Sequence, residues 1–162
     1  MKIKATIIII VTSLVFGCTK GGKLERISGD QYTVTSTAGS KQLVPAIDTT
    51  STGTFTGFYD EQSNVLTFTV TWNDLWRTAS KDTITSVNVY GPATAATNGA
   101  VVRVLPFVST NNAASANLGL AGISGFTMSE NKDFLEGAYY FTINTKKYPN
   151  GIIRGQLAAT KQ

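Results

Sequence analysis

Carboxylates are the side chains with which this sequence could do most chemistry, because its 162 residues include no histidine and only one cysteine. The absence of histidine excludes histidine-activated nucleophiles, histidine metal ligands and a histidine pH switch. The single cysteine excludes an intrachain disulfide and a cysteine-rich zinc site. The acidic residues that stand where a site could form are Asp60, Glu61, Asp74, Glu130, Asp133 and Glu136.

These carboxylates match no catalytic or calcium-binding motif. A glycosidase needs two carboxyl groups about 5–10 Å apart across a cleft, and nothing in the spacing places a pair in that way. Residues 130–136 also lack the spacing of an EF-hand loop. We therefore predict no catalytic residue, no metal ligand and no cofactor, and we favour a non-enzymatic role in binding or structure. A carboxylate-dependent hydrolase or a calcium-binding protein is the alternative.

Three neutral polar residues are a better candidate for a binding site. Strict alternation places Asn88 and Tyr90 on one face of an expected strand at residues 83–90. The same period places Asn144 on the polar face of an expected strand at residues 138–145. If the two strands are neighbours, these side chains could line one pocket and hydrogen-bond a sugar or a peptide. The alternative is that they are ordinary solvent-facing or cross-strand polar residues.

Trp76 and Arg77 form a second candidate surface, just beyond a strand whose core face includes Trp72. An exposed tryptophan can stack on a sugar or anchor a protein partner, whereas a buried one would cover the core. Both interpretations stay open at this point. Residues 109–117 (STNNAASAN) are expected to form a surface loop, which could also contact a partner.

The N-terminal residues have the pattern of a secretory leader. Lys2 and Lys4 precede an apolar run at residues 5–16, which is shorter than the roughly 20 residues that a spanning helix needs. The following residues VFGC (15–18) resemble a bacterial lipobox, in which a small residue precedes a cysteine that becomes lipidated. We therefore predict a signal peptide at residues 1–17 and lipidation at Cys18, since two or more acyl chains anchor a protein stably.

The charge balance argues against a polyanionic partner. Removal of Lys2 and Lys4 with the leader leaves 12 basic against 10 acidic residues, a net charge of +2. No extended basic cluster is present, so no nucleic-acid partner is expected. The expected location is the cell envelope, with the protein held to a membrane by its lipid and facing the periplasm or the cell surface. The expected partner is an envelope protein or glycan.

The mature chain has the pattern of an all-β domain at residues 43–162, preceded by a polar tether at residues 18–42 that includes one strand at 31–37. A hairpin is expected at 54–60 and 65–72, with Leu66, Phe68, Val70 and Trp72 on its core face. A helical turn is expected at 130–136. Further strands are expected at 83–90, 100–107, 123–128, 138–145 and 151–158.

Several of these segments resemble the CHRD domain, a family named after chordin. The residues GAYYFTINT (137–145) and YPNGIIRGQL (148–157) resemble its closing signature, an aromatic-Tyr-Val-Asn-Val-His-Thr run followed by Pro-x-Gly-Glu-Ile-Arg-Gly-Gln. The residues VNVYGPA (87–93) resemble its Ala-His-Ile-His-Gly-Pro-Ala, and VPA (44–46) with residues 49–55 resembles its opening segment. The resemblance spans residues 43–158 in the right order.

The resemblance implies an immunoglobulin-like or superoxide-dismutase-like Greek-key β-sandwich of about 7–8 strands, without an established activity. The family's three histidines are replaced by Asn88, Tyr90 and Asn144, so no metal chemistry carries over. Arg154, Gly155 and Gln156 are expected to be structural. Because Ile152 replaces a family glutamate, Arg154 must find a carbonyl or water as its partner.

Overall fold

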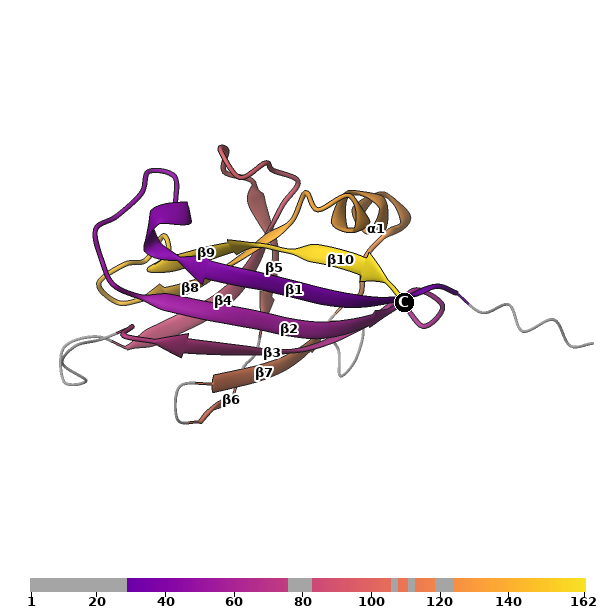
Figure 1. The fold of residues 1–162 in the computed structure, drawn as a ribbon, viewed down its shortest axis with the longest axis horizontal. Coiled ribbons are helices and arrows are strands. Elements are labelled where there is room, and N and C mark those ends of the chain that lie inside the picture. The colour runs from indigo at the N-terminus through magenta and orange to yellow at the C-terminus, as the bar shows by residue number, and fades with distance from the viewer. Residues whose placement is uncertain (1–28, 76–82, 106–107, 111–112, 119–123) are drawn as a thin grey trace, which may run out of the picture.

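The protein is an all-β domain in which one long antiparallel sheet curls over a hydrophobic core (Figure 1). The computed structural model describes residues 29–75, 83–105, 108–110, 113–118 and 124–162. Its elements are β1 (Gln31–Gly39), the 3₁₀ turn η1 (Ser40–Gln42), β2 (Thr52–Asp60), β3 (Val65–Asn73), β4 (Ile84–Gly91), β5 (Ala100–Leu105), β6 (Val108–Thr110), β7 (Ala113–Leu118), α1 (Met128–Leu135), β8 (Tyr140–Thr145), β9 (Ile153–Gln156) and β10 (Ala158–Lys161).

The strands follow the order β5-β4-β8-β9-β1-β2-β3-β7-β6, and β10 also pairs with β1. The sheet closes over itself, so that Phe55 on β2 packs against Phe141 on β8 with ring centroids 5.5 Å apart. One half of the sheet is β5-β4-β8-β9 and the other is β1-β2-β3-β7-β6. The two halves are joined where β9 pairs with β1, through the register pair Gly39 and Arg154. The expected β-sandwich is therefore confirmed, and among the described residues it contains ten strands rather than seven or eight.

The expected hairpin is β2 and β3, and its alternation predicts burial correctly. Leu66, Phe68, Val70 and Trp72 are all buried, while the threonines between them are exposed. Each such side chain stabilises the fold by roughly 1.5–3 kcal/mol through the apolar surface that it removes from water. The period-two pattern therefore determines which face of this hairpin covers the core.

Two expectations for the second half of the chain are wrong. The expected loop at residues 109–117 instead contains the end of β6 and most of β7, and β7 pairs with β3 from Leu66–Leu118 to Thr71–Ala113. Its run of alanine, serine and asparagine has a low strand propensity, but the open edge of β3 supplies the backbone partners. The expected strand at 123–128 is not formed in its described part, since residues 124–127 are irregular and Met128 begins α1.

The expected helical turn at 130–136 is α1, which begins slightly earlier at Met128. Thr127 and Glu130 form a capping box: Glu130 N donates to Thr127 Oγ1 at 3.2 Å, and Thr127 N donates to Glu130 Oε2 at 2.8 Å. This reciprocal pair satisfies two of the backbone N–H groups that a helix start leaves free.

The expected strand at 31–37 is β1, which occupies the middle of the sheet between β2 on one side and β9 and β10 on the other. Among the residues that the structure describes, the first strand therefore begins at Gln31, ahead of residue 43. The C-terminus returns to this point, where Gln162 N donates to Gln31 O at 2.9 Å (Figure 1). In the part of the chain that the structure describes, no helix is long and apolar enough to cross a membrane.

Candidate binding site

The polar residues predicted for a site come together because β4 and β8 are paired neighbours. Asn88 is opposite Thr142, Tyr90 is opposite Tyr140, and Ser86 is opposite Asn144. Arg154 on β9 is in turn opposite Thr142. These side chains share the face of β4, β8 and β9 that points away from the core, because Val87, Val89, Phe141, Ile143 and Ile153 belong to the buried cluster on the other face.

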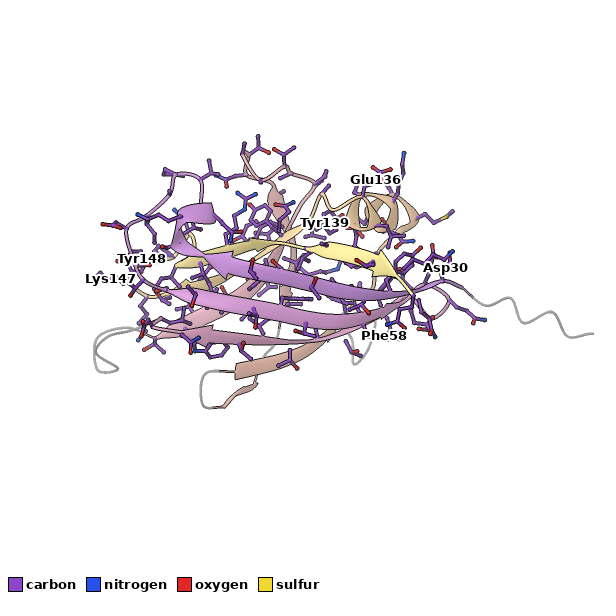
Figure 2. The ribbon with its side chains drawn as sticks, viewed as in Figure 1. Asp30, Phe58, Glu136, Tyr139, Lys147 and Tyr148 are labelled. Carbon is purple, nitrogen blue, oxygen red and sulfur yellow. The ribbon has the colours of Figure 1, made fainter. Side chains whose placement is uncertain are left out.

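A cavity of about 490 Å³ lies over this polar face. Its floor consists of Tyr90, Tyr140, Thr142 and Arg154. The remaining lining residues come from three connecting segments: Leu43, Val44, Pro45 and Ile47; Asn98 and Gly99; and Lys147, Tyr148, Pro149, Asn150 and Gly151. Figure 2 shows Lys147 and Tyr148 at the end of the molecule opposite to Asp30 and Glu136. We call this cavity the tyrosine pocket.

Of the three predicted polar residues, Tyr90 lines the tyrosine pocket and the two asparagines support it. Asn88 Nδ2 donates to the Tyr90 hydroxyl at 3.2 Å. Asn144 Nδ2 donates to Pro149 O at 2.6 Å, which ties β8 to the 147–151 wall, and its Oδ1 accepts from Thr142. The Oδ1 of Asn88 is buried and has no partner among the described residues.

Arg154 is the charged group in the floor of the pocket. Its side chain is only 1% exposed. It donates to Thr94 O at 2.8 Å, to Asn98 Oδ1 at 3.3 Å and to Gln156 Oε1 at 3.4 Å. The expected carbonyl partner is thus present, and none of the three acceptors carries a charge. Burial lowers the pKa of the Arg154 guanidinium below its ordinary value, and the nearby Tyr140 partly offsets this.

Two tyrosine rings hold the Arg154 side chain in place. Its guanidinium carbon lies 3.6 Å from the centroid of the Tyr140 ring. The Tyr140 ring stacks on Tyr90, with centroids 5.1 Å apart and planes 4° from parallel. Gly99 N donates to the Tyr140 hydroxyl at 3.2 Å, so a loop also positions the middle ring. The stack fixes the plane in which the guanidinium presents its N–H groups.

The residues after Arg154 hold β9 against its neighbours. Gln156 Nε2 donates to Ala93 O at 2.9 Å and to Gly137 O at 2.8 Å. Gly155 lies where a Cβ atom would be 2.8 Å from the Phe141 ring. Both residues therefore have structural contacts, and Gln156 also connects the Arg154 region to the 92–99 loop.

Three of the carboxylates considered for catalysis or calcium binding, Asp60, Glu61 and Glu130, have structural contacts. Glu130 accepts from Arg103 at 2.9 and 3.2 Å, Asp60 accepts from Ser63 N at 3.0 Å, and Glu61 accepts from Asn131 at 3.1 Å. Within the described ranges, no three acidic or other metal-ligating side chains lie close enough together to hold an ion.

Glu130 gives the domain a predicted dependence on pH. Partial burial raises the pKa of this carboxyl. The hydrogen bonds from the Thr127 N–H and the Arg103 guanidinium lower the pKa by more than burial raises it, so that the pKa lies below its ordinary value of 4.5. Its contribution to stability is therefore complete above about pH 4.5 and is lost as the pH falls through the folded-state pKa. We expect Glu130→Gln to lower the free energy of unfolding at neutral pH and to flatten its decline in acid.

Urea unfolding at pH 7 and at acidic pH tests this prediction. Glu136→Gln is the matched control, because Glu136 is exposed and its contact with Lys132 is 3.9 Å long. An acid decline in Glu130→Gln that equals the decline of the unaltered protein would contradict the assignment.

Sequence reasoning missed several residues of the tyrosine pocket. Tyr140 had a readable signal, since it follows the same alternation as Thr142 and Asn144. No sequence pattern indicated Asn98, Lys147 or the 43–47 segment, because these residues lie in loops that only the folded chain brings over the sheet. Trp76, Arg77 and Cys18 lie outside the described residues.

The fold and the pocket together define a β-sandwich domain with a small-molecule-sized cavity on the outer face of its sheet. A family model for the CHRD domain matches residues 33–157, which is most of the chain. The chain therefore belongs to the CHRD-domain family. No curated protein and no solved structure matches it.

Proposed function

We propose that this protein is a non-enzymatic binding module, held to the cell envelope by a lipid on Cys18, that takes its ligand in the tyrosine pocket. The observation that carries the proposal is the pocket itself, whose volume of about 490 Å³ falls among those of small-molecule sites, roughly 300–1,000 Å³. Its floor combines aromatic rings with hydrogen-bonding side chains, which is the composition of such sites. Among the described residues no carboxylate lines it, which favours binding over hydrolysis.

The lipid anchor is supported by the leader and by its lipobox-like end at residues 15–18. Lys20, Lys23 and Arg26 follow the predicted lipidation site and favour anionic head groups. The first strand among the described residues begins at Gln31, so a segment of chain lies between Cys18 and that strand. An envelope glycan or protein is then the ligand within reach.

Cys18→Ser is expected to move the protein from the membrane fraction to the soluble fraction, because the serine cannot receive the acyl chains that hold it. Fractionation and the intact mass of the mature protein measure this. Thr19→Ser is the matched control and should remain lipidated. Membrane retention of Cys18→Ser, or an unmodified Cys18 in the native protein, would contradict the anchor.

Binding in the tyrosine pocket is tested by blocking its mouth. We expect some members of a panel of soluble envelope saccharides and short peptides to shift the amide NMR signals of Tyr90, Tyr140 and Arg154. Asn150→Trp places a large ring at the exposed wall of the pocket and should abolish these shifts. Asn73→Trp, at another exposed position on β3, is the control and should leave them unchanged. A panel without any such shift would contradict the binding role.

A further inference from the structure

We propose that the ligand of the tyrosine pocket is an acidic saccharide whose carboxylate is received by Arg154 at the floor and Lys147 at the wall. This inference rests on the proposed binding function and adds the chemical class of the ligand. It starts from the charge balance of the pocket. Arg154 and Lys147 line it, whereas no aspartate or glutamate in the described part of the chain does so.

The burial of Arg154 is the first argument. A buried charge is costly unless it is paired, and the three described acceptors of this guanidinium are all neutral. Two of the three hydrogen bonds, at 3.3 and 3.4 Å, are also longer than the roughly 2.9–3.0 Å typical of N–H···O bonds. The protein therefore holds a positive charge out of water without a counter-charge among the residues described.

The donor count is the second argument. A guanidinium has five N–H groups, and the three hydrogen bonds of Arg154 leave Nε and one N–H of Nη1 without a partner in the described structure. A hydrogen bond between a guanidinium N–H and a carboxylate is stronger than one between neutral groups. These two donors lie on different edges of the guanidinium, because Nε–H shares its edge with Nη2, so each could give a ligand carboxylate one charge-assisted hydrogen bond.

The tyrosine stack makes this arrangement rigid before any ligand arrives. Tyr140 lies 3.6 Å below the guanidinium carbon and is itself supported by Tyr90. A ring face attracts the cation but occupies none of its in-plane N–H groups. The side chain therefore loses little conformational freedom when an anion binds, which favours affinity.

The remaining contacts favour a saccharide over a peptide. Extended peptides are often bound by adding a strand to an open sheet edge, but the floor strands β4 and β8 are each paired on both sides. The floor and walls offer neutral hydroxyl and amide groups from Tyr90, Asn98 and Asn150. These groups both donate and accept, as the hydroxyl groups of a sugar ring require.

NMR titration with D-glucuronate and D-glucose tests the inference, since the two differ in the carboxylate. We expect glucuronate to shift the pocket signals at a concentration about 10-fold lower than glucose does. Lys147→Glu should weaken glucuronate binding by about 10-fold, whereas Lys146→Glu, the adjacent exposed lysine outside the pocket, should change it less than about 2-fold. The two variants have the same net charge.

Arg154→Met is the second arm and should weaken glucuronate binding by about 100-fold. It is expected to fold, because methionine fills a similar volume and because Thr94 and Asn98, which hold two of the three former acceptors, are exposed residues. If it does not fold, the comparison of Lys147→Glu with Lys146→Glu still decides the matter.

Equal binding of glucose and glucuronate, or equal effects of the two lysine variants, would contradict the inference that the ligand is acidic. Neither outcome would contradict the proposed binding function. Binding of a peptide carboxylate in preference to glucuronate would overturn the saccharide. The absence of pocket shifts from every saccharide and peptide tested would overturn the binding function itself.

Discussion

Phe134→Ala is expected to lower the free energy of unfolding by about 3–5 kcal/mol, the cost of deleting a fully buried ring that leaves a cavity. Phe134 is the one residue of α1 that is buried. Its ring stacks on Phe126 with centroids 4.6 Å apart and meets the edge of Tyr59 at 5.2 Å. Because this aromatic cluster packs α1 against the sandwich, the decrease in the free energy of unfolding should lie in the upper part of the range for single substitutions.

Urea unfolding followed by tryptophan fluorescence measures this effect. Met128→Ala is the matched control on the same helix, because Met128 is 94% exposed. Its effect should stay within about 0.5 kcal/mol. A loss of less than about 1 kcal/mol in Phe134→Ala would show that α1 can detach without disturbing the core.

Gly155→Ala is expected to lower the free energy of unfolding by about 1–3 kcal/mol through overpacking. A Cβ atom at this position would lie 2.8 Å from the Phe141 ring and 3.0 Å from the Ala38 Cβ, and it would overlap the Ser36 hydroxyl. Those neighbours belong to β8 on one side and β1 on the other. The added methyl group therefore pushes apart the strands at which the two halves of the sheet join.

Gly39→Ala is the matched control, because Gly39 lies in the same β9–β1 junction. A Cβ atom there would have Gln42 Nε2, 4.0 Å away, as its nearest neighbour. Its φ of −156° is ordinary extended backbone. Thermal unfolding should show a lower Tm for Gly155→Ala and an unchanged or slightly higher Tm for Gly39→Ala. Equal Tm values for the two variants would contradict the tight packing at Gly155.

The parts of the fold that were predictable are those in which local sequence and tertiary environment agree. The alternation in β3 identified its buried face, and β4 and β8 placed Asn88, Tyr90 and Asn144 on a common outer face. The helical turn near residue 130 was expected, although the capping box at Thr127 and Glu130 went unread. A strand was expected at 123–128, where the structure has this cap and the start of α1. The reason is that short apolar runs do not distinguish a strand from a helix.

The strand β7 shows where local reasoning fails. Its small polar residues have the composition of a loop, and they form a strand because the edge of β3 supplies a complete set of backbone partners. Strand pairing between distant segments depends on the whole fold, so composition alone does not reveal it.

By itself, the sequence determined the all-β class, the buried faces of its clearest strands and the shared face of the polar residues, because a period of two follows from strand geometry. The resemblance to the CHRD family added that Ile152 stands where the family has a glutamate, so that Arg154 would lack that carboxylate as a partner. Only the tertiary structure decided that Tyr140 stacks between Arg154 and Tyr90, and that three connecting segments enclose a pocket over them. The physical reason is that register and loop placement depend on contacts between residues far apart in the chain.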